Sequence, residues 1–429
     1  MHVAVIADDL TGACGTGALL VSLGRVRVTL EYAADRLRTA GTGAPDALVV
    51  CTDSRAAIPA VAAARTAAVA TALRRLRPVL VGKRIDSTLR GWIGHELRAL
   101  LEVLPDRAVV VPAAPAAGRT VVGGVVRVGG TPLAHVEGVR EPAEDVTGHV
   151  PALVARQSGM EVAHVPLETV RHGPEAVRDV LAAYHGRIVV VDAETDGDLA
   201  RIARACDGLP VIPVDPGPFT AALARRRVPR TAGGPGAVQP TAVRVLVLAG
   251  SPTQLVARQV QALARATGTD VVHLDPARAG DAAHWGDVAD RARAQLHRAG
   301  VAIVCPAPAG GHGGTRPERA GPDATAAADV RAVARALGAV AGRVLEAGPP
   351  GVGLVATGGD VALATCRALG ARAIEVLGEV LPLCAAGRLL YGRHEGTPIV
   401  TKGGMVGDDD ALVRAWRALR EGWVPAWSP

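Results

Sequence analysis

The stretch MHVAVIADDLTGACGTGALL (residues 1–20) predicts a strand, a polar turn and a helix in direct succession. Residues 1–7 form a short apolar run with the β-branched content of a buried strand. Asp8 and Asp9 follow at once, and Thr11 is a plausible cap for the helix. In a parallel sheet this junction lies at the carboxyl end of a strand, where open α/β proteins bind ligands. Two adjacent carboxylates repel each other, which favours a functional site here over a single capping aspartate.

The composition excludes several classes of protein. The chain has 429 residues, enough for two or three domains, and its 2% aromatic content leaves Val, Leu, Ala and Ile to form the core. Its net charge of +6 is spread along the sequence, and few aromatics are present to stack on bases, so nucleic acid is a poor partner. Its cysteines show no CxxC spacing, and no apolar run reaches the ~20 residues of a membrane span. We expect a soluble cytoplasmic protein.

Apolar strands and helices alternate along the whole chain, which predicts an α/β fold with mostly parallel sheets flanked by helices. The strands expected after the first lie at 26–32, 46–51, 78–82, 107–115, 188–195, 209–215, 243–251, 271–275, 302–308, 352–360 and the start of 398–412. Residues 225–241 are rich in Arg, Gly and Pro without periodicity, which indicates a linker over 229–241. We therefore expect two domains, 1–228 and 242–429.

Four strand ends of the first half carry polar residues. They are Asp8–Asp9, Thr52–Arg55, Lys83–Arg90 and Gly118–Thr120. Parallel strands place such ends along one edge of the sheet. Lys and Arg hold carboxylates, and Asp and Ser exchange hydrogen bonds with hydroxyls, so the set suits a polyhydroxy acid. The alternative is a surface salt-bridge cluster in which Ser87 caps the next helix.

Three glycine-rich turns of the second half each follow an apolar strand and precede a helix. They are Gly250–Ser251, Thr357–Asp360 and Lys402–Gly407. Glycine lets backbone N–H groups approach phosphate oxygens, and a helix N-terminus adds a favourable dipole. A single turn is explained equally well by tight geometry, but three favour nucleotide or phosphate binding. The chain contains neither a GxxxxGK[ST] nor a GxGxxG fingerprint.

Six segments together carry a more specific signal. They are IADDLTGA (6–13), KRIDSTLRG (83–91), PAAPAAGRT (112–120), AGS (249–251), ATGGDVA (356–362) and VTKGG (400–404). In this order they resemble the four-carbon acid sugar kinase family, over essentially the whole chain. The resemblance implies that the first domain binds threonate, erythronate or an oxo relative, that the second binds ATP, and that the active site lies in the cleft between them.

The resemblance also assigns residues. On the sugar-acid side it implies Asp8, Asp9, Arg55, Lys83, Asp86, Ser87, Arg90 and Arg119. On the nucleotide side it implies Ser251, Gly358, Gly359, Asp360 and Gly404, and the same turns add Thr357, Lys402 and Gly403. Two departures stand out. Gly15 occupies a place where the family often has Asp, and the last turn lacks the aromatic of the family's KSGxFG motif.

These observations give one mechanistic hypothesis and one rival. In the first, Arg90 and Lys83 clamp the acid's carboxylate, while Asp9 or Asp8 accepts or aligns the terminal hydroxyl that attacks the γ-phosphate of ATP. Asp360 reaches Mg²⁺ directly or through water. The rival is a non-catalytic sensor that binds a sugar acid and a nucleotide, which Gly15 slightly favours. The sequence allows a homodimer in either case.

Overall fold

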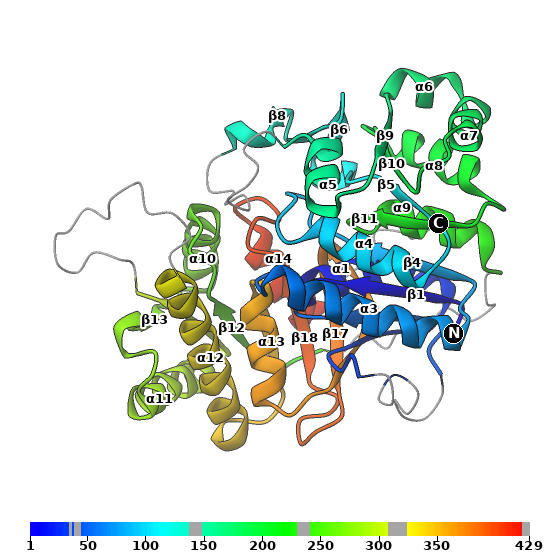
Figure 1. Cartoon of the computed structure of the whole chain (residues 1–429). Coiled ribbons are helices and arrows are strands. Elements are labelled where there is room, and N and C mark those ends of the chain that lie inside the picture. The colour runs from blue at the N-terminus through cyan, green and yellow to red at the C-terminus, as the bar shows by residue number, and fades with distance from the viewer. Residues whose placement is uncertain (34–36, 38–43, 137–147, 230–240, 308–323, 423–429) are drawn as a thin grey trace. The chain divides into compact units, whose positions relative to one another are not determined.

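The computed structural model describes residues 1–33, 37, 44–136, 148–229, 241–307 and 324–422. The chain forms two compact units, Met1–Ala237 and Val238–Pro429. Most of the expected linker, residues 230–240, lies outside the described residues. Figure 1 labels many of the elements of both units. Each unit is an α/β layer structure, so the predicted fold class is confirmed.

The first unit is built on a sheet in which every pairing is parallel. Its strands are β1 (Val3–Ala7), β2 (Val26–Thr29), β3 (Ala47–Cys51), β4 (Leu80–Arg84), β5 (Arg107–Val110), β9 (Val162–Val165), β10 (Ile188–Val191) and β11 (Val211–Asp215). Their order is β2-β3-β1-β4-β11-β5-β10-β9. All five residues of β1 are buried, as expected for a strand covered on both faces. The carboxyl ends of β3, β1 and β4 are therefore neighbours.

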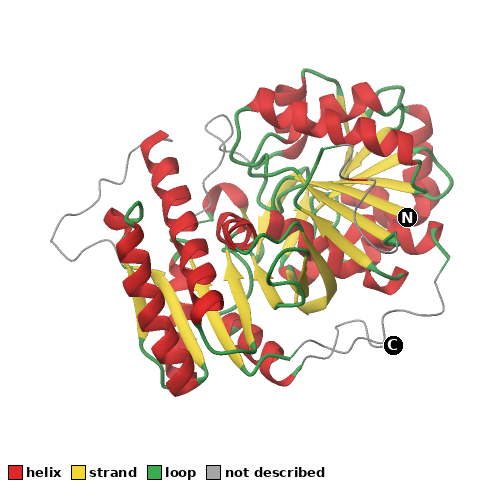
Figure 2. Cartoon of the chain, turned by 90° about the horizontal axis from the view of Figure 1, so that it is seen from below, coloured by secondary structure: helices red, strands yellow, loops and turns green. Residues whose placement is uncertain are grey.

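Helices cover both faces of this sheet, as Figure 2 shows. They are α1 (Leu10–Leu20), α3 (Pro59–Leu76), α4 (Ile93–Val103), α5 (Val150–Ser158), α6 (Leu167–His172), α7 (Pro174–Ala183), α8 (Asp196–Cys206) and α9 (Pro218–Arg227). Helices α3, α4 and α5 pack side by side, and α1, α9, α8 and α7 form a second row. A small antiparallel sheet of β6 (Arg119–Val122), β7 (Val125–Val128) and β8 (Thr131–Pro132) follows β5.

The second unit has a mixed sheet with the order β13-β14-β12-β15-β18-β17-β16. Its strands are β12 (Arg244–Ala249), β13 (Val271–Leu274), β14 (Val301–Pro306), β15 (Val352–Thr357), β16 (Ala373–Leu381), β17 (Cys384–Leu390) and β18 (Pro398–Lys402). Its helices are α10 (Gln254–Thr267), α11 (Ala282–Ala299), α12 (Ala324–Ala347), α13 (Gly359–Ala368) and α14 (Ala411–Glu421). Only β17 runs antiparallel to its neighbours.

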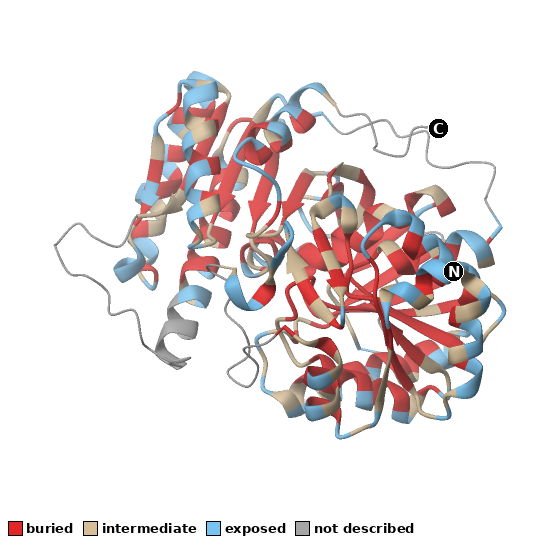
Figure 3. Ribbon diagram, turned by 90° about the horizontal axis from the view of Figure 1, so that it is seen from above, coloured by how far each residue is buried: buried red, intermediate tan, exposed pale blue. Residues whose placement is uncertain are grey.

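The structure departs from the sequence-based expectation in several places. The β16–β17 hairpin and strand β9 were not predicted, and β2 and β5 are shorter than expected. Strand β4 was expected over 78–82 but runs to Arg84, so Lys83 and Arg84 are its last two residues. Successive side chains of a strand point to opposite faces of the sheet, so these two neighbours enter different environments. Both are buried, as are most strand residues in Figure 3.

No helix in the described part of the chain is long and apolar enough to cross a membrane.

Candidate functional site

Three carboxylates and three guanidinium groups meet at the carboxyl ends of β3, β1 and β4. The carboxylates are Asp8, Asp9 and Asp86, and the guanidinium groups are those of Arg55, Arg84 and Arg90. We call this set the acidic–arginine cluster. Because each strand end contributes one part of it, the parallel order β3-β1-β4 is what brings it together. The edge that the sequence predicted therefore exists as a connected network of ion pairs.

Two arginines bind the aspartate pair at once. Arg55 donates from Nε to Oδ2 of Asp8 (2.7 Å) and from Nη2 to Oδ1 of Asp9 (2.7 Å). Arg84 donates from one nitrogen, Nη1, to Oδ1 of Asp8 (2.9 Å) and to Oδ1 of Asp9 (2.7 Å). The repulsion between the adjacent carboxylates is thus offset by two shared cations.

The cluster holds its buried carboxylates in the ionised form. Burial of Asp8 acts to raise its pKa, but Arg55 and Arg84 overcome this effect and lower the pKa to about 2. Burial likewise opposes ionisation of Asp86, yet Arg90 and Arg55 hold its pKa well below the ordinary range. Arg90 makes a bidentate contact with Asp86 through Nε (2.7 Å) and Nη2 (3.0 Å). Both carboxylates are therefore hydrogen-bond acceptors at neutral pH.

Asp9 is the more accessible member of the pair. Its side chain is 11% exposed, against 4% for Asp8. It caps α1 by accepting a hydrogen bond from the backbone N–H of Gly12 at Oδ1 (3.0 Å), and its Oδ2 accepts from the hydroxyl of Thr11 (2.6 Å). Both oxygens of Asp8, in contrast, face guanidinium donors. Oδ2 of Asp9 is thus the oxygen best placed to accept a further hydroxyl.

Lys83 is buried beneath the acidic–arginine cluster. Its side chain is fully buried, and Nζ forms an ion pair with Oε2 of Glu96 on α4 (2.9 Å) and donates to the carbonyl of Arg84 (2.9 Å). The other oxygen of Glu96 accepts a hydrogen bond from Ser54, which is bonded to Thr52 (2.7 Å). This buried chain joins the ends of β3 and β4 to α4. Lys83 therefore supports the site from within.

The remaining two predicted residues of this half are also near the cluster. Ser87 is 6% exposed in the connection between β4 and α4, next to Asp86. Arg119 is the first residue of β6 and is 9% exposed. Burial lowers the pKa of Arg119 while the charge of Asp86 opposes this shift, which places Arg119 within electrostatic reach of the cluster.

Arg84 is a member of the cluster that sequence reasoning did not single out. Its side chain is 6% exposed and passes over α1 at Gly12. A Cβ atom on Gly12 would overlap the Arg84 guanidinium group, so glycine at this position lets Arg84 reach the aspartate pair. The signal in the sequence was a glycine in the first turn of a helix, where it costs helix propensity and needs a packing reason.

The three glycine-rich turns of the second unit also converge. They follow β12, β15 and β18, which are adjacent in the sheet. A Cβ atom on Gly404 would overlap Oγ of Ser251, and one on Gly358 would lie 4.0 Å from Cβ of Ser251. Gly358, with φ of 100°, precedes the first turn of α13, which contains Gly359 and the exposed Asp360. Thr357 is buried at the end of β15.

The carbonyl groups of the last turn point into the unit. Nζ of Lys402 binds the carbonyls of Gly403 (2.8 Å) and Val406 (3.1 Å). From α10, Nε2 of Gln259 binds the carbonyls of Val406 (3.1 Å) and Asp408 (2.7 Å). Gln259 is fully buried and 147 residues from Val406, so no local sequence pattern indicated this contact. With its carbonyls engaged, the turn is built to offer N–H groups to an anion.

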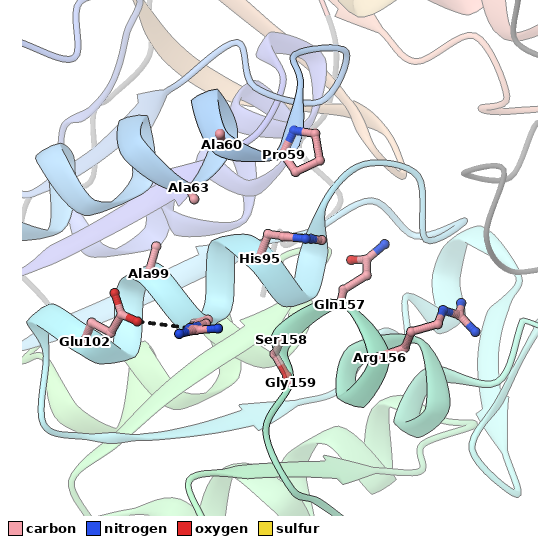
Figure 4. A pocket seen from close by; sticks show the side chains of 11 residues that line it. Pro59, Ala60, Ala63, His95, Ala99, Glu102, Arg156, Gln157, Ser158 and Gly159 are labelled. Carbon is pink, nitrogen blue, oxygen red and sulfur yellow. Dashed lines mark hydrogen bonds and ion pairs between the residues drawn. The ribbon is translucent and has the colours of Figure 1, made fainter.

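A cavity of about 510 Å³ opens elsewhere in the first unit, between α3, α4 and α5 (Figure 4). None of the predicted site residues lines it. Arg98 donates to Glu102 (3.1 Å) and Gln157 accepts from the backbone N–H of Gly94 (2.9 Å), while His95 Nδ1 and Gln157 Nε2 have no hydrogen-bond partner among the described residues. Because none of the residues chosen from the sequence lines this cavity, we centre the functional interpretation on the acidic–arginine cluster and the glycine-rich turns.

Comparison with known proteins agrees with the placement of one set of site residues in the first unit and another in the second. Residues 3–223 match a family model described as a sugar-binding N-terminal domain, and residues 246–412 match one described as a nucleotide-binding C-terminal domain. Each of the two family models thus matches one of the two compact units. It is 39% identical to the D-erythronate kinase of Heliobacterium modesticaldum, over 96% of this chain and 95% of that protein. It is 34% identical to the D-threonate kinase of Bordetella bronchiseptica, over 98% of both.

The chain belongs to the four-carbon acid sugar kinase family, as the sequence motifs predicted. A crystal structure of a protein from Salmonella typhimurium LT2 shares the fold, with a TM-score of 0.74 at 22% identity, covering 97% of this chain and 99% of that one.

Proposed function

We propose that this sugar acid kinase uses ATP to phosphorylate the terminal hydroxyl of a four-carbon sugar acid of the erythronate or threonate type. The observation that carries the proposal is the acidic–arginine cluster, which combines ionised carboxylates for hydroxyl groups with guanidinium groups for a carboxylate. The family relatives named D-erythronate and D-threonate kinase support the choice of substrate. The proposed domain limits remain 1–228 and 242–429.

In this mechanism the cluster binds and orients the acid. Arg90 has the most exposed side chain of the three arginines (37%), so we assign it to the substrate carboxylate. Oδ2 of Asp9 accepts the hydrogen bond of the attacking hydroxyl and aligns it. Phosphoryl transfer passes through a loose transition state, so alignment and charge neutralisation contribute more than strong base catalysis. Lys83 and Arg84 position these groups from below.

Ser251, Gly358 and Gly404 are the proposed contacts to the nucleotide phosphates. A Cβ atom on Gly404 would overlap the Ser251 hydroxyl, Gly358 has a φ of 100° that favours glycine, and backbone N–H groups at such turns suit phosphate oxygens. Mg²⁺ neutralises charge on the transferring group when it is bound. Among the described residues, no group of three or more His, Cys, Asp or Glu side chains is placed to hold a metal. Mg²⁺ commonly relies on one or two carboxylates, waters and the phosphates themselves, so Asp360 fits the role.

A coupled assay of ADP release tests the proposal against a panel of D-erythronate, D-threonate, L-threonate and 3-oxo-tetronate. We expect release with at least one acid, and an Asp9→Asn variant that has lost turnover but binds ATP as tightly as the wild type. Asp207→Asn, which changes a surface carboxylate paired with Arg226, is the matched control and should keep full activity. Binding of a sugar acid and ATP without any ADP release would favour the sensor instead.

A further inference from the structure

Of the 47 lysine and arginine residues in the chain, only two are lysines, Lys83 and Lys402. Each is the last or next-to-last residue of a strand, and the side chains of both are fully buried. Lysine differs from arginine in presenting a compact point charge on a flexible stem. In a chain that otherwise uses arginine, both lysines therefore occupy sites where a planar guanidinium group would be a poor fit.

The two lysines differ in what balances their charge. Lys83 is paired with the carboxylate of Glu96. Lys402 forms no ion pair with a carboxylate in the part of the chain that the structure describes, and its ammonium group is held by the carbonyls of Gly403 and Val406. A buried charge usually has an ionic partner, because carbonyl dipoles replace only part of its hydration. Lys402 thus leaves a positive charge under the last glycine-rich turn.

The other titratable groups around Lys402 do not supply that partner. Cys384 on β17 lies directly opposite Lys402 on β18, and its own pKa is raised by burial to about 12, so it is a neutral thiol at pH 7. Glu379 on β16 and Arg414 on α14 act on Cys384 from further away. Burial lowers the pKa of Lys402 to about 8, although Cys384 opposes this shift. The site therefore favours an incoming negative charge.

The turn above Lys402 is positioned for such a charge. Lys402 and Gln259 hold the carbonyls of Gly403, Val406 and Asp408, and the hydroxyl of Thr253 reaches the carbonyl of Gly404 (3.3 Å). In a trans peptide group the N–H points away from the carbonyl, so the N–H groups of this turn point away from Lys402 and Gln259, on the side of Ser251. An anion bound there is separated from the ammonium group only by the turn itself.

We propose that Lys402 is a positioning residue for the nucleotide: it fixes the turn through two carbonyls, and a bound phosphate group balances its buried charge, so that nucleotide binding and protonation of Lys402 are coupled. This inference rests on the proposed nucleotide site. It makes Lys402 a group that acts through the turn without touching the phosphate. By linkage, a nucleotide that stabilises the protonated lysine must bind less tightly once the pH exceeds the pKa of the free protein.

The presence of only two lysines allows a direct test by NMR of protein labelled with ¹³C-lysine. The side-chain Cε–H signals report ionisation, and Lys402→Met identifies the signal of Lys402. We expect its titration midpoint to rise by at least one pH unit when ADP is bound. We also expect ADP affinity, measured by calorimetry, to fall about five- to tenfold between pH 7 and pH 9, as linkage requires for a free-protein pKa of about 8 that rises by one unit or more.

Three variants separate this role from a general structural one. Lys402→Met should weaken ADP binding at pH 7 and remove the pH dependence. Gln259→Leu, which loosens the same turn but keeps the lysine, should weaken binding and retain the pH dependence. Arg393→Met removes an exposed positive charge of the same unit, with a side chain 88% exposed, and should change neither.

The possible failures are distinguishable. If the wild type binds no ADP at any pH, the proposed nucleotide site is wrong. If ADP binds but the Lys402 signal keeps its midpoint, or Lys402→Met binds ADP as the wild type does, only the present inference is overturned. Circular dichroism and urea unfolding show whether each variant is folded. The titration midpoint of Lys402 is measured by NMR on the wild-type protein, and Lys402→Met is needed only to assign its signal.

Discussion

Replacing Gly12 by alanine should destabilise the protein, although helix propensity alone predicts the opposite. Gly12 lies in the first turn of α1, and alanine is favoured over glycine in a helix by about 1 kcal/mol. Its Cβ, however, would occupy the space of the Arg84 guanidinium group. Arg84 must then leave its position between Asp8 and Asp9.

The size of the loss follows from what Arg84 holds. Its Nη1 lies 2.9 Å from Oδ1 of Asp8 and 2.7 Å from Oδ1 of Asp9, and its side chain is 6% exposed. Removing one partner from a buried ion pair costs about 3–5 kcal/mol. Subtracting the gain in helix propensity leaves a net loss of about 2–4 kcal/mol.

Urea unfolding of the full chain, followed by circular dichroism, measures this effect. Gly197→Ala is the matched control, because Gly197 is an exposed first-turn glycine of α8 whose added Cβ would meet Arg201 Nη1 at an ordinary 3.5 Å. It should be neutral or slightly stabilising. In an Arg84→Ala background, Gly12→Ala should no longer destabilise, because the colliding group is absent. A Gly12→Ala variant as stable as Gly197→Ala would refute the reasoning.

Three further predictions concern the same edge of the sheet. Glu96→Gln should lower the free energy of unfolding in urea by about 3–5 kcal/mol, because it leaves the buried ammonium group of Lys83 without its anion. The double variant Lys83→Met with Glu96→Leu removes both charges and should lose far less stability. Equal losses for the single and the double variant would contradict this reasoning. The folded-state pKa of Asp8 is depressed to about 2, so ionisation of Asp8 contributes about 2 kcal/mol of stability above pH 4. The difference in melting temperature between the wild type and Asp8→Asn should therefore vanish as the pH falls toward 2. Arg90→Lys keeps the charge but loses the planar guanidinium group that binds Asp86 through two nitrogens, so the cation assigned to the substrate carboxylate is no longer held in place. It should raise the KM for the sugar acid about tenfold and leave the KM for ATP unchanged, as steady-state kinetics would show.

The sequence by itself determined the architecture and predicted where the chemistry takes place. Short apolar runs identified the strands, and Gly or Asp at their ends marked the turns. Asp8, Asp9, Arg55, Asp86 and Arg90 could be chosen because polar residues at the carboxyl ends of parallel strands share one edge. The structure brings these five together in one network.

The tertiary structure alone decided which side chains face the surface and which support it from within. Lys83 and Arg84 are neighbours in the chain, but the extra length of β4 sends one to Glu96 and the other to the aspartate pair. Gln259 reaches a turn 147 residues away. Local pattern carries no information on such contacts, because they depend on strand order and on the side-chain packing of distant segments. For the same reason, the sequence showed that Gly12 begins a helix, while only the fold showed that an arginine passes over it.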